Sequence, residues 1–244
     1  MLSKSEAKYI QSLSQKKYRL QENLFVAEGP KIIEEALNNT AVKIKKVFAV
    51  EEWMEAHKKH AAQYDVATIT QNELERISQL KTPNQVVALI EMNGNDDFVL
   101  KKEKLALALD GIQDPGNMGT IVRIADWFGI EQIICSTDCA DIYNSKVVQA
   151  SMGSIFRVQV FYTELANWLA SQTCTTIYGA ALNGSTLKSY NKVQKGIVVI
   201  GNESKGIRQD VMQQIAQKIT IAKIGHAESL NAAVATGIIL SHII

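Results

Sequence analysis

The sequence predicts an α/β protein in which a small α/β domain precedes a larger domain built on a mostly parallel sheet. Two observations predict this class. Short apolar runs alternate with segments of helical length and periodicity along the whole chain. A change of composition at residues 93–103 divides that alternation into two parts.

The first part, residues 1–92, contains several runs with the length and composition of strands. Phe25–Glu28 is predicted as a strand, and Pro30 opens a helix because its missing N–H is not needed in the first turn. This pattern is typical of a small α/β domain. The elements predicted after this helix are a strand at 42–50, a helix at 51–60, a strand at 66–70, a helix at 72–80 and a strand at 86–92.

Residues 93–103 are predicted as a linker because they are rich in turn-forming and charged residues. Beyond the linker, Leu105–Leu109 is a continuous apolar run, which is typical of a strand buried on both faces of a parallel sheet. Residues 104–244 are therefore predicted as one domain. Its further elements are strands at 131–136, 156–162, 176–182, 197–200 and 219–222, and helices at 118–128, 143–152, 164–171, 207–215 and 230–243.

Composition excludes several classes of protein. Of the 244 residues, 46% are hydrophobic and only three are proline, so the chain can form a core and is neither disordered nor proline-rich. The net charge is +1, although residues 1–46 carry nine Lys/Arg against five Glu. That local excess suits phosphate contacts and a solvated surface equally well.

Cysteine and histidine spacing predicts neither disulfides nor a metal site. The three cysteines lack CxxC spacing, and His57 and His60 share a helix face without a third ligand. The N-terminus has no apolar signal segment, and the apolar run at 232–244 is shorter than the roughly 20 residues that cross a bilayer. We therefore expect a cytoplasmic protein without a membrane partner.

Three predicted strand-to-helix loops carry more glycine and polar residues than a turn requires. They are residues 110–119, 201–206 and 225–231. Such loops meet at the carboxyl edge of a parallel sheet, where ligands usually bind. The chain has no GxGxxG loop after a strand, no Walker lysine loop and no GxSxG elbow, which counts against three common kinds of site.

The candidate side chains in these loops also have plainer interpretations. Arg123 lies off the apolar stripe of its helix, where it is either a solvated residue or a ligand contact. Asn117 is predicted to cap the same helix. Glu203 lies between two glycines, either in a simple turn or beside a ligand. Ser229 and Asn231 cap the last helix, contact a ligand, or do both.

The last predicted helix, 230–243, is apolar on every face. A helix of this kind is buried either inside the protein or at a subunit interface. The sequence leaves both arrangements open.

Together, the three loops resemble the three signature motifs of the SpoU (TrmH-type) RNA 2′-O-ribose methyltransferases of the SPOUT superfamily. The matching segments are Asn117-x-Gly119-x-x-x-Arg123, Gly201-Asn202-Glu203-x-x-Gly206 and Ser229-Leu230-Asn231. The resemblance implies a C-terminal trefoil knot, S-adenosylmethionine as cofactor and a homodimer. Residues 1–92 are similar in layout to the small RNA-binding domain that precedes the knot in many members.

The same resemblance implies two sets of site residues. The catalytic set is Asn117, Arg123, Glu203, Ser229 and Asn231. The cofactor-binding set is Leu182, Asn183, Gly184, Gly201, Ile221 and Leu230. Ala222 departs from the family pattern, which has proline after the isoleucine that ends the strand, so residues 222–225 are expected to be looser.

The implied reaction is methylation of a ribose 2′-hydroxyl in RNA, with ribosomal RNA preferred and transfer RNA as the alternative. Arg123 is proposed for the family as the base. Because a guanidinium resists deprotonation, we favour a role in which it holds a phosphate and lowers the pKa of the hydroxyl. Two other classes remain: a non-catalytic RNA-binding or assembly protein, and an enzyme of small nucleotides on an ordinary doubly wound sheet.

Overall fold

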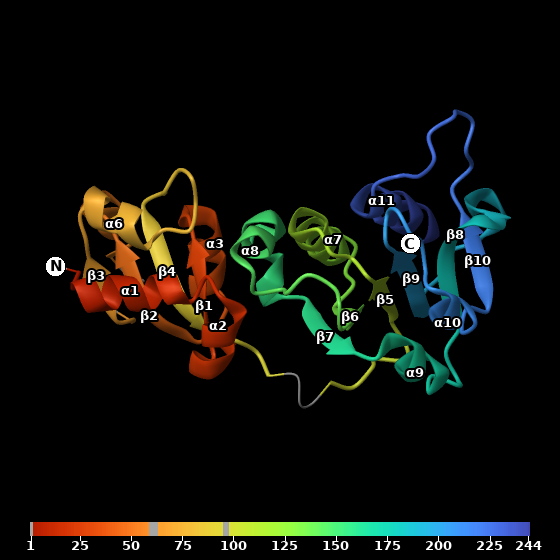
Figure 1. Cartoon of the computed structure of the whole chain (residues 1–244), viewed down its shortest axis with the longest axis horizontal. Helices are drawn as coiled ribbons and strands as arrows, with labels where there is room; N and C mark the ends of the chain where they lie inside the picture. Colours follow the sequence, from red (N-terminus) through yellow and green to blue (C-terminus); the bar gives the residue numbers. More distant parts are fainter. Residues whose placement is uncertain (1, 59–62, 95–97) are drawn as a thin grey trace. The chain divides into compact units, whose positions relative to one another are not determined.

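Two β-sheets organise the chain (Figure 1). The computed structural model describes residues 2–58, 63–94 and 98–244. The first unit consists of Met1–Asn93 and Tyr143–Phe156, and the second of Gly94–Ile142 and Arg157–Ile244. Residues 59–60 of the predicted helix 51–60, including His60, and residues 95–97 of the predicted linker lie outside the described residues.

The first unit contains a four-stranded mixed sheet in the order β1-β4-β2-β3. Both β1 and β2 pair antiparallel with β4, whereas β3 pairs parallel with β2. The strands are β1 (Leu24–Glu28), β2 (Ile44–Ala49), β3 (Val66–Thr68) and β4 (Val86–Glu91). The helices are α1 (Lys4–Ser12), α2 (Lys16–Glu22), α3 (Pro30–Leu37), α4 (Glu51–Ala56), α6 (Gln71–Ile77), α8 (Ser145–Ser151) and the 3-10 turn η1 (Ser154–Phe156).

The segment Tyr143–Phe156 packs with the first unit although it follows residue 104 in the chain. The rings of Tyr143 and Phe25 have centroids 4.7 Å apart. The side-chain amide of Gln149 donates to the carbonyl oxygen of Glu28 at 2.8 Å. The alternation of strands and helices predicts this segment within the second domain. Its contacts with the first unit could not be predicted, because local periodicity carries no information about residues that are distant in the sequence.

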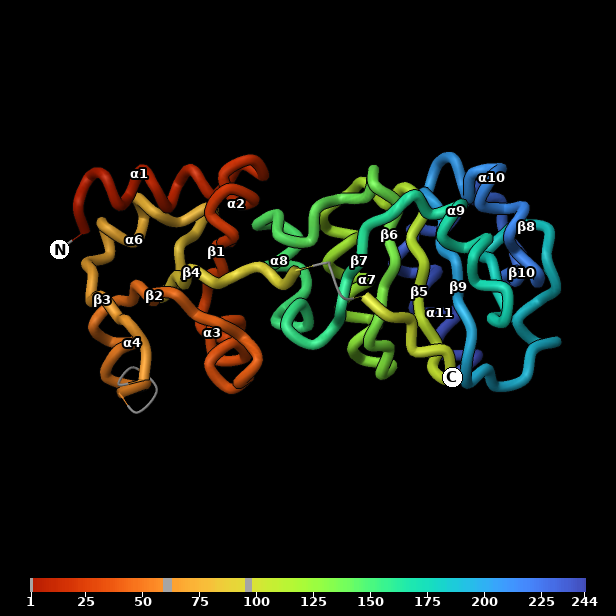
Figure 2. Tube along the Cα trace, turned by 90° about the horizontal axis from the view of Figure 1, so that it is seen from below, coloured from red at the N-terminus to blue at the C-terminus, as the bar shows by residue number. Residues whose placement is uncertain are grey.

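The second unit contains a six-stranded sheet in the order β10-β8-β9-β5-β6-β7 (Figure 2). All five strand pairs are parallel, which confirms the predicted mostly parallel sheet. The strands are β5 (Leu105–Asp110), β6 (Gln132–Ser136), β7 (Gln159–Thr163), β8 (Ile177–Thr186), β9 (Gly196–Gly201) and β10 (Gln217–Thr220). The helices are α7 (Pro115–Trp127), α9 (Leu165–Ala170), the 3-10 turn η2 (Leu187–Ser189), α10 (Gln209–Met212) and α11 (Ala232–Ile243).

Helices cover both faces of this parallel sheet. Figure 1 shows α7 and α11 on one side and α9 and α10 on the other. On the latter side, Ala106 and Ala108 of β5 belong to one apolar cluster with Leu169 and Val211. Because both faces are covered, every residue of β5 is buried, as its continuous apolar run predicts.

The register of β5 and β9 brings two of the predicted loops together. Asp110, the last residue of β5, is the partner of Gly201, the last residue of β9. The loops that follow these strands therefore begin side by side at the carboxyl edge of the sheet.

Several elements of the second unit differ in length from the prediction. The helix predicted at 207–215 is only α10, Gln209–Met212. The strand predicted to end at Leu182 continues to Thr186. Over the described part of the chain, we find no helix with the length and apolar character needed to cross a membrane.

Candidate active site

The first loop leads into α7, whose N-cap is Asp114. The Asp114 carboxylate accepts the backbone N–H of Asn117 at 2.8 Å, and Pro115 occupies the first helical turn. The prediction that Asn117 caps this helix is therefore wrong, since the helix begins earlier. As a consequence, the Asn117 side chain is available for contacts with other segments.

A chain of side-chain hydrogen bonds joins all three motif segments. Asn231 caps α11, where its Oδ1 accepts the N–H groups of Ala233 and Val234 at 3.0 and 3.2 Å. Its amide nitrogen donates to Oδ1 of Asn117 at 2.8 Å, and the Asn117 amide donates to the Glu203 carboxylate. Because helix N–H groups occupy the Asn231 oxygen, its nitrogen must point outward. The orientation of each amide and the place of the carboxylate follow from this cap.

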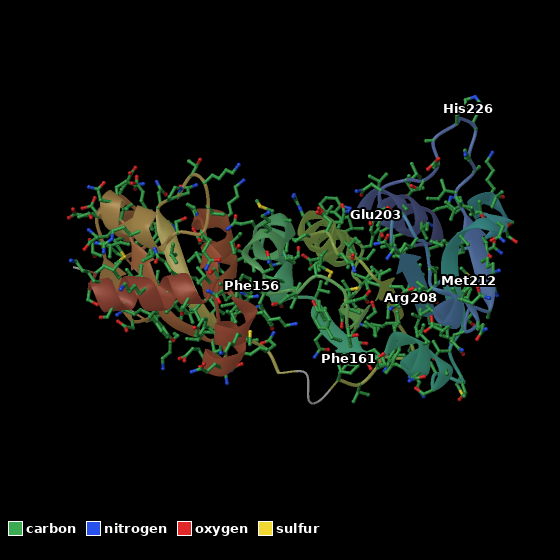
Figure 3. All side chains as sticks on the ribbon, in the orientation of Figure 1. Phe156, Phe161, Glu203, Arg208, Met212 and His226 are labelled. Carbon is green, nitrogen blue, oxygen red and sulfur yellow. The ribbon has the colours of Figure 1, made fainter. Side chains whose placement is uncertain are left out.

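Glu203 lies in a tight loop after β9 and is labelled in Figure 3. Asn202 and Gly206 exchange backbone hydrogen bonds of 3.1 and 2.8 Å across this loop. The side-chain oxygen of Asn202 accepts two further loop N–H groups at 2.9 and 3.1 Å. A Cβ at Gly201 would lie 2.4 Å from the carbonyl carbon of Gly206, so only glycine permits this approach.

The predicted cofactor residues Leu182, Asn183 and Gly184 lie at a bulge of β8. The pairing of β8 with β10 shifts by several residues here, so this part of the strand leaves the regular ladder. The Thr220 hydroxyl donates to the carbonyl oxygen of Ala181 at 2.7 Å and accepts the N–H of Gly184 at 2.5 Å. Thr220 therefore fixes the base of the bulge.

The segments predicted to bind cofactor present apolar side chains to solvent. Leu182 is 77% exposed, Ile224 is 100% exposed and Leu230 is 45% exposed. Ile221 is half-buried directly after β10, where the segment that contains the third loop begins, and Ala222 follows it on the surface. Figure 3 shows this loop extending away from the sheet, with His226 at its tip. An apolar ligand face at this edge would cover side chains that nothing else buries.

The structure does not bring two predicted catalytic residues into this network. Arg123 lies on the exposed side of α7, and Ser229 is exposed in the third loop. Within residues 2–58, 63–94 and 98–244, neither side chain has a hydrogen bond or an ion pair. The same described residues include no cluster of three or more His, Cys, Asp or Glu arranged to hold a metal ion.

Two residues beside the network, Asp110 and Arg208, were not singled out from the sequence. The carboxylate of Asp110 accepts the backbone N–H and the Nε of Arg208, both at 2.7 Å. This hydrogen bonding raises the pKa of the Arg208 guanidinium above its usual range. A usable signal was present, because Asp110 is the one polar residue ending the otherwise apolar run LALALD.

Buried polar groups also hold the start of the first loop. The Ser136 hydroxyl accepts the N–H of Gly111 at 2.9 Å, and the Cys139 thiol accepts the N–H of Ile112 at 3.3 Å. Hydrogen bonding with the Cys135 thiol lowers the pKa of Cys139 to about 7. Cys135 and Cys139 are buried, whereas Cys174 is exposed, so the expectation that all three thiols are at least half-buried is wrong for Cys174. Cys139 has the additional role of a backbone acceptor.

Family profiles match both parts of the chain. A profile of the SpoU rRNA Methylase family matches residues 104–241, and a profile of an MRM3-like substrate binding domain matches residues 4–88. The 23S rRNA (guanosine(2553)-2′-O)-methyltransferase RlmP of Bacillus subtilis is 27% identical over 234 residues, which cover 95% of this chain and 92% of the relative.

Solved structures with the same fold extend over nearly the whole chain. A protein of the TrmH family from Porphyromonas gingivalis has a TM-score of 0.88 and 35% identity, over 99% of this chain and 98% of its own. The AdoMet-bound rRNA methyltransferase from Sinorhizobium meliloti has a TM-score of 0.87 and 27% identity, over 100% of this chain and 96% of its own.

Proposed function

The chain belongs to the SpoU rRNA Methylase family, and on that premise we propose that it methylates a ribose 2′-hydroxyl of RNA with S-adenosylmethionine. The observation that carries this proposal is the hydrogen-bonded chain from Asn231 through Asn117 to Glu203. It joins motif segments that lie 86 and 114 residues apart in the sequence. A scaffold or a simple RNA-binding protein has no need of such a network.

Ribosomal RNA is the substrate that the relatives favour over transfer RNA. The Bacillus subtilis relative is named for 2′-O methylation of 23S rRNA, and the Sinorhizobium meliloti neighbour is an rRNA methyltransferase. An rRNA substrate also agrees with the cytoplasmic location expected from the sequence.

The residues at the carboxyl edge of the sheet fit S-adenosylmethionine. Backbone groups of Leu182–Gly184, Gly201, Ile221 and Leu230 would hold it, with the Leu182 and Leu230 side chains against its adenosine. Both side chains are exposed, and the backbone of the bulge is fixed by Thr220. Apolar side chains beside a few fixed backbone groups are the usual lining of such sites. When bound, the cofactor supplies a methyl group on a sulfonium.

Arg123 acts on the RNA in this proposal. It is an exposed cation on α7 with no partner among the described residues, so it can hold a phosphate of the target nucleotide. A cation beside the 2′-hydroxyl also lowers the pKa of that hydroxyl. A guanidinium keeps its own proton, so it serves poorly as a base.

The other residues of the catalytic set keep the site in shape. Asn117 and Asn231 hold the Glu203 carboxylate in one orientation at the sheet edge. Ser229 offers an exposed hydroxyl in the third loop, where it contacts substrate when that loop meets the RNA.

We assign RNA binding to the domain 1–92, methyl transfer to the domain 104–244, and a linker to 93–103. The MRM3-like substrate binding profile over residues 4–88 supports the first assignment. We also propose a trefoil knot at the C-terminal end. The N–H of Val193 donates to the carbonyl oxygen of Ile243 at 2.6 Å, so the segment before β9 lies against the end of α11. This contact of the chain end with an earlier segment, together with the three motif segments, supports the proposal.

A homodimer is the third part of the proposal, with α7 and α11 as its interface. Trp127 of α7 and Val234 and Ile238 of α11 are large apolar side chains exposed to solvent. The two helices contact each other within the protomer, where Gly237 lies against Ile124. Their exposed apolar residues are typical of a surface that a second copy covers.

The substitution Arg123→Ala tests the function. We expect methyl transfer to rRNA to fall on the order of 10²–10³-fold, as for loss of one positioned catalytic contact. Calorimetric titration with S-adenosylmethionine should give an unchanged Kd, because Arg123 binds RNA. Lys102→Ala, which removes another exposed cation, is the control. Equal losses of transfer and cofactor binding would contradict the role of Arg123.

The same assays separate the alternative functions. A wild-type protein that binds RNA but not S-adenosylmethionine would be a non-catalytic RNA-binding or assembly protein. Transfer to tRNA in preference to rRNA would identify a tRNA methyltransferase, and binding of a small nucleotide alone would indicate a nucleotide enzyme. Mapping unmethylated riboses in RNA from a deletion strain identifies the target nucleotide.

A further inference from the structure

The loop that carries Glu203 is held at both ends by Asp110 and Gly111, the last residue of β5 and the residue after it. At its start, the Asn202 side-chain amide donates to the carbonyl oxygen of Gly111 at 2.8 Å. At its end, Arg208 binds the carboxylate of Asp110 through its backbone N–H and its Nε, both at 2.7 Å, and through a second guanidinium nitrogen at 2.5 Å. The place of the loop is therefore set by β5 as well as by β9.

Asp110 and Arg208 differ from an ordinary surface ion pair. The Asp110 side chain is 0% exposed, whereas that of Arg208 is 47% exposed. A buried carboxylate is costly without a partner, and the Arg208 main chain and side chain supply three donors to it. Arg208 also reaches Asp138 at 3.4 Å. The pair therefore has one preferred arrangement, which a flexible surface pair lacks.

The position of Arg208 at a helix start does not explain this contact. Arg208 is the N-cap residue of α10, yet its side chain makes no cap hydrogen bond. Instead it turns back toward β5, five residues after Glu203. Asn202 and Gly206 form a backbone bridge that encloses Glu203, and only Ile207 separates this bridge from Arg208. A shift at Arg208 is thus passed on to the Glu203 carboxylate rather than absorbed on the way.

We propose that Asp110 and Arg208 are positioning residues for methyl transfer, which act by holding Glu203 against Asn117. The proposal rests on the proposed function, since it assumes that Glu203 serves the reaction. A merely structural pair would stabilise the fold to the same extent whether or not residue 203 is a glutamate. A positioning pair matters for turnover only while the carboxylate is there to be positioned.

The test is a double-mutant cycle with Arg208→Met and Glu203→Gln. We expect Arg208→Met to lower kcat by about 10²-fold, as displacement of a positioned group does, while the Kd for S-adenosylmethionine and the KM for RNA change little. In the Glu203→Gln background, Arg208→Met should lower kcat by less than about twofold, because the effects of substitutions at interacting residues are not additive. Arg208→Lys should recover part of kcat, since it keeps the charge but loses the planar fork.

The control is Lys195→Met, which breaks the 3.0 Å ion pair with Glu103 at the opposite end of β5 and β9. It should leave kcat unchanged in both backgrounds. Thermal melting and cofactor binding show whether Arg208→Met folds. If it does not fold, the same double-mutant cycle with Arg208→Lys in its place tests the positioning role.

The possible outcomes separate the two proposals. Equal losses from the Arg208 variant in the wild-type and Glu203→Gln backgrounds would overturn the positioning role and leave the proposed function standing. A wild-type protein that transfers no methyl group to RNA would overturn the proposed function and this inference with it.

Discussion

Gly201 makes the second motif loop possible because it lacks a side chain. A Cβ there would lie 2.4 Å from the carbonyl carbon of Gly206 and 2.5 Å from the nitrogen of Ile207. Ordinary contacts begin at 3.4 Å, so the loop backbone would have to move by about 1 Å, which is 3.4 − 2.4. The obstructing atoms belong to the main chain and cannot rotate away. We therefore expect Gly201→Ala to displace the whole loop.

The expected losses of stability and of methyl-transfer rate follow from this displacement. Overpacking of this kind destabilises by about 1–3 kcal/mol. For a folding unit of roughly 150 residues, each kcal/mol lowers Tm by about 2–4 °C. Glu203, two residues further on, moves relative to Asn117, and a shift of about 1 Å at a reacting site costs about 10²-fold in rate. The rate of methyl transfer should therefore fall by much more than the loss of folded protein alone would cause.

Thermal melting, urea denaturation and a methyl-transfer assay with calorimetric cofactor binding measure these effects. Gly94→Ala is the matched control, because a Cβ at Gly94 meets no atom of the described residues within 4 Å and its φ is not positive. It should leave Tm and transfer unchanged. If Gly201→Ala melts and turns over like Gly94→Ala, the argument that the close approach at Gly201 sets the position of Glu203 is refuted.

Substitutions at two further positions test separate parts of the structure. Asn231→Asp keeps an acceptor for the N-terminal N–H groups of α11 but loses the amide that donates to Asn117, so methyl transfer should fall while Tm stays unchanged. Asn231→Ala loses the helix cap as well, so it should also lower the free energy of unfolding by about 1 kcal/mol. In the first unit, burial raises the pKa of Glu28 above its ordinary 4.5, against the lowering effect of hydrogen bonds from Ser78 and Gln79. A raised carboxyl pKa contributes stability that is full below 4.5 and is lost as the pH rises through the folded pKa, so Glu28→Gln should remove this fall in the urea midpoint above pH 4.5. An unaltered pH dependence in the Glu28→Gln variant would contradict the assignment.

The sequence by itself determined the features that depend on local order along the chain. The apolar run Leu105–Leu109 is long enough to be buried on both faces of a sheet, and the structure contains it as the central strand β5. Glycine and polar residues at three strand ends marked the loops that form the candidate site. Local sequence suffices for such features because strand burial and turn formation depend mainly on neighbouring residues.

Only the tertiary structure decided which side chains meet. Asp114 rather than Asn117 caps α7, and this leaves Asn117 to bridge Glu203 and Asn231. The segment Tyr143–Phe156 packs with the first unit although its periodicity resembles that of the second. Such contacts join residues about a hundred positions apart, and their geometry is set by how the strands, helices and loops pack together in the fold. Spacing along the chain does not encode those distances, so the network at the sheet edge could be assembled only in three dimensions.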